Sequence, residues 1–289
     1  MAVYDRAYRP YEGPLTAAWS RFTVLPRYSY QQVLRSRPFI AFAVLCLLFP
    51  AASAVVIYLH HNLTALTMLR MDKSLLDQQL PINGFFFAVA LFVQSFLAFF
   101  LALFMGTSLI APDLTNNGLA LYLSRPFSRW EYILGRFATL AILMSLITWV
   151  PGLLLFIFQA YLEGWGWLTG HAFIGWAIFA GAWIWIILIT LLTMASSAWM
   201  RRKPLAAGMV VGVFFASSAI AHAINEAYRT AWGDLINLGG LTRTAWAGLF
   251  GTESPTGIPG GTAWLALVLY CALFLWLLTR KVRAYQVVR

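Results

Sequence analysis

Six long apolar runs that contain no Asp, Glu, Lys or Arg constrain this chain more than any other feature. Each is long enough to cross a hydrocarbon core, which takes about 20 helical residues. Continuous apolar sequence without alternation favours helices over barrel strands. The sequence therefore predicts an all-α integral membrane protein with six transmembrane helices, at Phe39–Leu59, Phe85–Ile110, Phe137–Leu162, Ala172–Met200, Leu205–Asn225 and a run centred on Thr262–Thr279.

The composition agrees with this prediction, because 61% of the 289 residues are hydrophobic and only 10% are charged, which is far from a soluble composition. The net charge of +10 does not predict nucleic-acid binding, since the basic residues cluster at the ends of apolar runs, as membrane topology demands. Cys46 and Cys271 both lie within apolar runs. We expect both cysteines to be packing residues, with no disulfide or metal site between them.

The distribution of Lys and Arg predicts the orientation of the chain. Sixteen of the 20 lie in the N-terminal stretch, the 111–136 segment, the 201–203 turn and the C-terminus, which fall on one side of six crossings. The positive-inside rule therefore places both termini in the cytoplasm. Residues 1–38 carry Leu15, Trp19 and Phe22 on one helical face, which predicts an N-terminal interfacial helix ahead of a six-helix domain over 39–289. The longest outer connection is 226–261, where 227–238 and 241–250 are each predicted to form a short helix.

The segment 112–136 is the longest polar interruption on the predicted cytoplasmic side. Leu119, Tyr122 and Leu123 follow an Asn-Asn-Gly turn signal at i, i+3 and i+4, which predicts one apolar stripe on a short helix. Pro126 ends that helix.

The next membrane helix begins with Ser128-Arg-Trp-Glu131, the pattern of a capping box in which Ser128 and Glu131 each bond the other's backbone N–H. Arg125, Arg129 and Arg136 make the segment basic. One interpretation is a segment that a partner protein grips. The alternative is an ordinary cytoplasmic loop whose arginines only set topology.

The run from Leu119 to Arg129, LALYLSRPFSR, followed by Tyr132 and Gly135-Arg136, resembles the permease subunits of ATP-binding cassette transporters of the ABC-2 type. That family has a leucine-rich "LLSxPxSR" signature and then a "Y…GK/R" motif at the start of the third membrane helix. This sequence departs from the usual pattern at Asn116-Asn117 and at Arg136. The matching positions are Asp113, Gly118, Leu121, Leu123, Ser124, Pro126, Ser128, Arg129 and Gly135.

The resemblance implies a type V exporter fold, in which two six-helix permeases, either two copies or a sister pair, work with two cytoplasmic ATPases. It implies that 112–136 is the coupling segment between this chain and an ATPase subunit. The sequence holds no G-x-x-x-x-G-K-[ST] motif, so ATP and Mg²⁺ are expected on the partner subunit, with no cofactor in this chain. The expected coupling residues are Asp113, Leu119, Tyr122, Leu123, Arg125, Pro126, Ser128 and Arg129.

In the same family the second and fifth membrane helices usually line the transport path. Gln94 and Ser95 in the second run and Ser217 in the fifth are therefore candidate pathway residues, the alternative being ordinary hydrogen bonds between helices. No ionisable residue lies deep within a run, which disfavours a proton-coupled secondary transporter. The aromatic, neutral interior favours a hydrophobic or amphiphilic substrate. The family resemblance implies export across a bacterial inner membrane, with periplasmic or accessory subunits as further possible partners.

Two other functions fit the sequence. Glu163, His171, His222 and Glu226 are expected at the same outer depth, where they and His60-His61 could form a metal or acid/base site of a membrane enzyme. A permease-like chain could also anchor a multiprotein machine in which ATP hydrolysis drives assembly or motion.

Overall fold

The computed structural model describes residues 26–27, 30, 33–68, 73–111, 113, 128–200 and 202–282. The predicted interfacial helix falls mostly outside the described residues, as does the predicted stripe of the 112–136 segment. No strand occurs in the described part of the chain. The helices are α2 (Arg37–His61), α3 (Leu63–Met68), α4 (Lys73–Gln79), α5 (Gly84–Met105), η2 (Gly106–Ser108), α8 (Arg129–Ile147), α9 (Trp149–Glu163), α10 (Trp165–Gly170), α11 (Ala172–Trp199), α12 (Lys203–Tyr228), η3 (Trp232–Leu235), α13 (Leu238–Phe250) and α14 (Gly260–Lys281).

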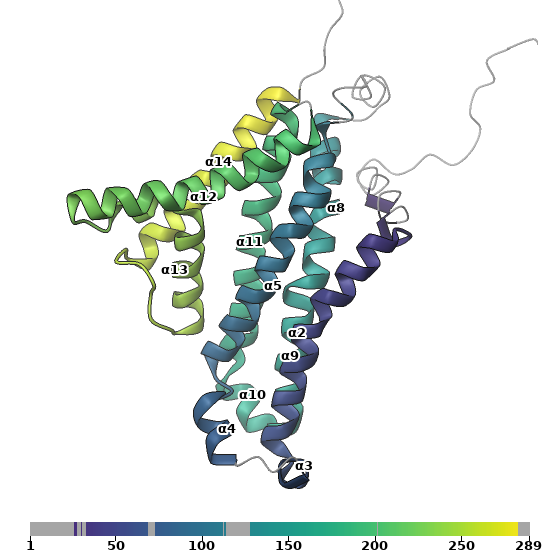
Figure 1. The fold of residues 1–289 in the computed structure, drawn as a ribbon, viewed down its shortest axis with the longest axis vertical. Coiled ribbons are helices and arrows are strands. Elements are labelled where there is room, and N and C mark those ends of the chain that lie inside the picture. The colour runs from purple at the N-terminus through teal and green to yellow at the C-terminus, as the bar shows by residue number, and fades with distance from the viewer. Residues whose placement is uncertain are drawn as a thin grey trace, which may run out of the picture.

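The six predicted crossings are confirmed as helical segments. Within the described residues, six segments are long and apolar enough to cross a membrane: α2, α5 with η2, α8 with α9, α11, α12 and α14. In Figure 1, α2, α5, α8, α9 and α11 run along the length of the bundle, and α3, α4 and α10 lie at one end of it. The start of α8 lies at the other end, which we call the basic end because it carries Arg129 and Arg136.

The third crossing is broken in its middle. Helix α8 ends at Ile147 and α9 starts at Trp149, with Thr148 between them at φ −95° and ψ −89°. Pro151 sits in the first turn of α9, where its ring would clash with the carbonyl of residue 147 if one helix continued through. The Thr148 hydroxyl donates to Met144 O at 2.9 Å. The break at Thr148 lies three residues before Pro151, as expected for a proline within a long apolar run.

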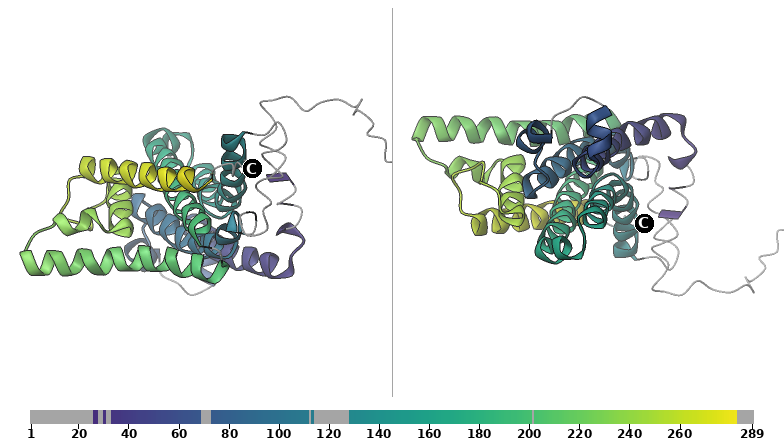
Figure 2. Two further views of the ribbon diagram at one scale, coloured as in Figure 1. Left: turned by 90° about the horizontal axis from the view of Figure 1, so that it is seen from above. Right: turned by 90° about the horizontal axis from the view of Figure 1, so that it is seen from below.

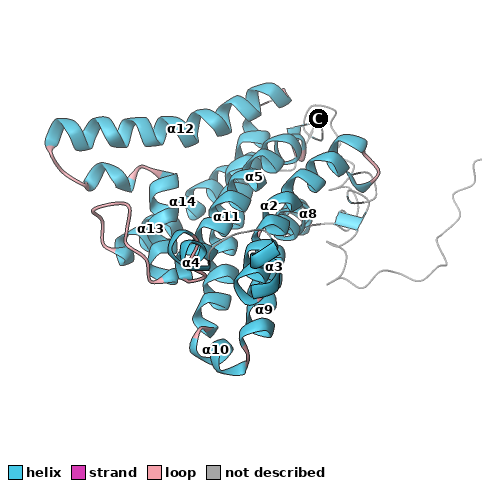
Figure 3. Cartoon of the chain, turned by 60° about the horizontal axis from the view of Figure 1, so that its bottom comes forward, coloured by secondary structure: helices cyan, strands magenta, loops and turns pink. Residues whose placement is uncertain are grey.

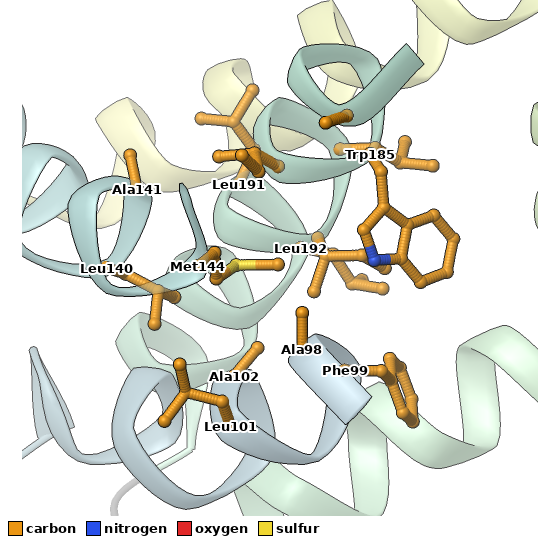
Figure 4. Close-up of a cluster of buried hydrophobic side chains, with 14 of the residues drawn as sticks. Ala98, Phe99, Leu101, Ala102, Leu140, Ala141, Met144, Trp185, Leu191 and Leu192 are labelled. Carbon is orange, nitrogen blue, oxygen red and sulfur yellow. The ribbon is translucent and has the colours of Figure 1, made fainter. Parts of the chain in front are cut away.

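Helix α11 is the most deeply buried of the long helices, since 72% of its most apolar 18-residue stretch is buried. It packs against α5, α8, α9, α12, α13 and α14. Figure 4 shows the layer in which Ala98 and Ala102 of α5 and Met144 of α8 meet Leu192 of α11. All of these side chains are at most 4% exposed.

Two indole groups join α11 to its neighbours through buried backbone carbonyls. Trp185 Nε1 of α11 donates to Ser95 O of α5 at 3.0 Å. Trp246 Nε1 of α13 donates to Gly181 O of α11 at 2.9 Å. Each indole therefore satisfies its N–H inside an apolar layer, where an unpaired donor would be costly.

Helix α12 has the predicted residues and composition of a crossing, yet it lies across the bundle and projects beyond it (Figures 1 and 2). It starts directly after a short turn, with Pro204 in its first turn, which favours an abrupt change of direction. Only Ala206, Val210, Ser217 and Ala221 are buried along its length. These residues share one face of α12, which packs against α11, α13 and η3, and the opposite face is largely exposed. The glycines of its G-x-x-x-G motif, Gly208 and Gly212, have no neighbouring atom within 4 Å of an added Cβ.

The outer connection forms only one of its two predicted helices at full length. Residues 241–250 belong to α13, whereas the predicted helix at 227–238 reduces to the short η3. The cause is local: Arg229 takes a left-handed conformation at φ 50° and ends α12, and Asn225 Oδ1 accepts from Gly233 N at 2.7 Å. Figure 2 shows α13 between α12 and α14, and it packs against both.

Gly106 provides the closest approach at the basic end of the bundle. A Cβ added there would lie 2.8 Å from Leu140 Cδ2 of α8 and 2.8 Å from Thr193 Oγ1 of α11. Thr193 is itself held by its hydroxyl, which donates to Ile189 O at 2.8 Å. Three helices therefore meet at a point that has room only for glycine.

We predict that Gly106→Ala destabilises the protein by about 1–3 kcal/mol, the usual cost of overpacking a tight core. Gly208→Ala is the control, because an added Cβ there meets open space and alanine favours a helix by roughly 1 kcal/mol over glycine. Thermal unfolding of both variants in detergent micelles checks this. Equal stability of Gly106→Ala and the wild type would contradict the close packing.

Candidate functional site

The start of α8 is fixed by the capping box that the sequence predicts. Glu131 N donates to Ser128 Oγ at 3.2 Å, and Ser128 N donates to Glu131 Oε2 at 2.5 Å. Two backbone N–H groups that would otherwise lack partners are satisfied reciprocally. Arg129 is the first residue of the helix and is exposed. The structure therefore presents the last residues of the 112–136 segment on a rigid helix start.

Asp113 lies in a half-buried polar cluster with two residues of α8. The Tyr132 hydroxyl donates to Asp113 Oδ2 at 2.7 Å, and Arg136 Nη2 donates to the same oxygen. The Arg136 guanidinium also lies over the Tyr132 ring, 5.6 Å from its centroid. Asp113 precedes the 114–127 stretch, and Tyr132 and Arg136 follow it. One carboxylate therefore joins the residues on the two sides of that stretch.

Burial makes this cluster costly to disturb. Tyr132 is fully buried, and the side chains of Arg136 and Asp113 are only 13% and 17% exposed. Removing one member of a buried ion pair leaves an uncompensated charge in a poorly solvated place. Arg136 Nε is also buried with no hydrogen-bond partner in the described residues. The cluster therefore depends on the Asp113 carboxylate.

Ser197 of α11 holds the residues just before Asp113. Its hydroxyl donates to Thr107 O at 2.9 Å and accepts from Ile110 N at 3.2 Å and Ala111 N at 3.0 Å. Ser197 is fully buried, so this one side chain replaces the helical hydrogen bonds that are lost where α5 ends. Sequence reasoning missed Ser197, because a serine within an apolar run carries no signal of such a contact.

Tyr30, from the chain ahead of α2, is tied to the same helix. Its hydroxyl donates to Ala138 O of α8 at 2.9 Å. Burial raises the pKa of Tyr30 to about 12, so the hydroxyl stays neutral and able to donate at physiological pH. The described part of the N-terminal segment thus contacts α8 within two residues of Arg136.

The predicted coupling residues divide into two groups. Asp113, Ser128 and Arg129 are described and lie at the start of α8 or against it. Arg136, which the sequence marked as one of three basic residues and as a departure from the family pattern, is the charge partner of Asp113. The remaining predicted residues lie outside the described residues: Leu119, Tyr122, Leu123, Arg125 and Pro126.

The predicted pathway residues all make contacts within the bundle. Gln94 is 2% exposed, and its Nε2 donates to Cys46 O of α2 at 3.0 Å. Ser95 is 1% exposed and offers its carbonyl to Trp185. The Ser217 hydroxyl donates to Phe214 O of its own helix at 2.8 Å. Their role in transport stays a prediction, and the observed contact of Gln94 is a bond between helices.

The expected outer constellation of four residues does not form. Helix α12, which carries His222 and Glu226, lies toward the basic end, whereas α10 lies at the opposite end (Figures 1 and 3). The prediction that these residues share a depth with Glu163 and His171 is therefore wrong, because α12 crosses the bundle instead of running along it. Among the described residues, no three His, Cys, Asp or Glu side chains are grouped so as to hold a metal ion.

A family model decides the membership of the chain. The model described as ABC-2 family transporter protein matches residues 29–280, a range that includes every helix except the last residue of α14. The chain belongs to this family. It is therefore a multi-pass membrane protein and a permease subunit of the ABC-2 type, and proteins of this family generally pair with ABC ATPase subunits. No curated relative matches the sequence.

We predict that Asp113→Asn destabilises this permease by roughly 3 kcal/mol, the lower end of the cost of breaking a buried ion pair. Tyr132→Phe, which removes one hydrogen bond, costs about 1 kcal/mol. Adding Arg136→Gln to Asp113→Asn restores part of the loss, because the unpaired charge is gone.

Chemical unfolding in detergent micelles measures these differences, with the exposed Glu253→Gln as a control. If the double variant were less stable than the wild type by the sum of the losses of Asp113→Asn and Arg136→Gln alone, the two side chains would be acting independently.

Proposed function

We propose that this permease is driven by a separate ABC ATPase that grips the 112–136 segment and pulls on α8 through the Asp113 cluster. The observation that supports this most is the shared carboxylate: Asp113 at the start of the segment bonds Tyr132 and Arg136 just beyond its end. A segment clamped at both ends transmits force better than a loop that hangs from two separate helices.

The capping box adds stiffness on the exit side of the segment. Because Ser128 and Glu131 satisfy each other's backbone N–H groups, the first turn of α8 resists fraying. Arg129 is exposed next to this turn and is offered to acidic groups of the ATPase. In this proposal the basic end of the bundle faces the cytoplasm of a bacterial cell, in agreement with the excess of Lys and Arg there.

The nucleotide belongs to the partner in this proposal. ATP and Mg²⁺ are held by the ATPase subunits, and two six-helix permeases, either two copies of this chain or this chain and a sister, complete the transporter. The exposed face of α12 supports the second permease. Its exposed apolar side chains include Leu205, Phe215, Ile220 and Tyr228.

A hydrophobic or amphiphilic substrate is favoured by the surface between η3 and α14. A cavity of about 680 Å³ lies there, with walls that are almost wholly apolar. The Tyr270 hydroxyl donates to Leu235 O at 3.2 Å, so its hydrogen bond is made to the backbone of the protein. The lining residues are Trp232, Leu235, Pro259, Gly261, Thr262, Leu265, Ala266, Leu269, Tyr270 and Leu273.

We predict that Arg129→Glu reduces the amount of co-purified ATPase at least tenfold, which corresponds to about 1.4 kcal/mol of binding. The measurement is affinity purification in detergent after co-expression with candidate ATPase subunits. Arg243→Glu is the matched control, since Arg243 is an equally exposed cation on α13.

If Arg129→Glu retained the ATPase in full, Arg129 would not be part of the interface with the ATPase. A wild-type chain that binds no ATPase under any condition would overturn the proposed function itself.

A further inference from the structure

Two consecutive histidines end α2 at the end of the bundle away from the Asp113 cluster. His61 Nδ1 lies 2.9 Å from Ile57 O, one turn earlier in the same helix. His61 Nε2 lies 2.7 Å from Glu163 Oε2 at the end of α9. The two ring nitrogens of His61 therefore both face oxygen atoms, one a carbonyl and the other a carboxylate.

His60 repeats the arrangement toward a different helix. Its Nδ1 lies 3.0 Å from Val56 O, and its Nε2 lies 3.5 Å from Asp77 Oδ1 of α4. The His60 side chain is only 9% exposed. Its Nε2 is buried and has no hydrogen-bond partner in the described residues, so the carboxylate of Asp77 is the nearest group that can satisfy a proton there.

The chemistry of imidazole makes both contacts depend on protons. A backbone carbonyl only accepts, so Nδ1 of each ring must carry a hydrogen. A neutral imidazole then presents a lone pair at Nε2, which a carboxylate repels. The His61–Glu163 contact at 2.7 Å therefore requires one further proton, either on Nε2 or on the Glu163 carboxyl. His60 Nε2 and Asp77 Oδ1 are farther apart, at 3.5 Å, and a proton on this nitrogen would give the pair its attraction.

We propose that the ends of α2, α4 and α9 form a proton-binding site, in which protonation of His61 and His60 fastens α2 to Glu163 and Asp77. The ligand is the proton itself. Because three or more metal-ligating side chains are not grouped anywhere in the described residues, a metal ion is not the occupant. This site is independent of the proposed ATPase coupling, since it lies at the other end of the bundle.

Other charged and titratable groups lie on the packed elements. Helix α4 also carries Lys73, α2 carries Tyr58 and α9 carries Tyr161. On α9, Gln159 Nε2 donates to Glu163 Oε2 at 3.4 Å, so the same carboxylate oxygen is shared between an amide and the imidazole.

The direction with pH follows from the proton count. At low pH the rings carry both hydrogens and the contacts are complete. As pH rises and the rings lose their Nε2 protons, each contact becomes a lone pair facing a carboxylate, and the stability that the site adds is lost. Histidine is the side chain whose ordinary titration falls between pH 5 and 8, so the attachment of α2 to α9 responds to the pH at this face.

The matched control is His171. Its Nδ1 lies 3.0 Å from Trp167 O, the same one-turn geometry as in His60 and His61. Among the described residues, no carboxylate lies within ion-pair distance of His171. His171→Gln therefore removes a helix-end histidine without removing a proton-dependent contact.

The first test is ¹⁵N NMR of histidine-labelled permease in lipid nanodiscs. The chain has only four histidines, and His61→Gln and His171→Gln assign their signals. We expect the His61 ring to carry hydrogens on both nitrogens at pH 5.5 and on one at pH 8.5, and Glu163→Gln to lower its protonated fraction at intermediate pH. A His61 ring with a single proton at pH 5.5, or one that ignores Glu163→Gln, would overturn the proposal.

The second test measures stability and does not rest on signal assignment. Thermal unfolding in micelles is compared for wild type, Glu163→Gln and His171→Gln. We expect Glu163→Gln to lower Tm by roughly 2–4 °C at pH 5.5, as for an interaction of about 1 kcal/mol in a chain of this size. At pH 8.5 we expect the same substitution not to lower Tm, because it then removes a repulsive contact. A Tm difference that is the same at both pH values would contradict proton-dependent fastening.

Discussion

The close packing of neighbours on α11 is the constraint on which the rest of the bundle depends. Lipid tails are as apolar as leucine, so helices in a membrane associate through close contact and hydrogen bonds more than through the hydrophobic effect. Helix α11 supplies both. Its contact with η2 leaves room only for Gly106, and the indoles of Trp185 and Trp246 bond across its two sides. A chain that lost these contacts would keep its helices but lose their arrangement.

Charged contacts between described side chains are few, and they lie toward the two ends of the bundle. The Asp113–Arg136 pair occupies one end, and the two histidine–carboxylate contacts occupy the other. A charge is costly in the membrane interior, so contacts between charged groups are expected near the ends of the bundle. Both the proposed ATPase contact and the proposed proton site follow this rule.

The sequence predicted what depends on neighbouring residues. The six apolar runs became the six long segments, and the Ser128–Glu131 capping box formed as its four-residue pattern indicates. It did not predict contacts across the fold. Ser197 reaches residues 86 to 90 positions earlier, and nothing in the sequence indicated this. His61 meets Glu163 across 102 positions, whereas the sequence indicated only that both residues could belong to one outer site. No local pattern encodes such pairs, because they depend on which helices become neighbours.

The direction of α12 was missed for the same reason. Apolar composition predicts that a helix avoids water, but it does not fix the angle at which the helix leaves the preceding turn. The predicted outer grouping of His222 with Glu163 relied on a parallel fifth helix and failed with it. Pro204 beside the turn was the available hint.

The break at Thr148 divides the third crossing into two arms of unequal attachment. The Asp113 cluster is built on α8, before the break, whereas Glu163 closes α9 after it. Pro151 has no N–H to donate to the carbonyl of residue 147, so the crossing bends there more easily than elsewhere. A tilt applied to the first arm is therefore absorbed partly at this joint. The position of α9 also depends on the contact between Glu163 at its end and His61 of α2. A bend at Thr148 therefore allows α8 and α9 to change their tilt separately, each near a different end of the bundle.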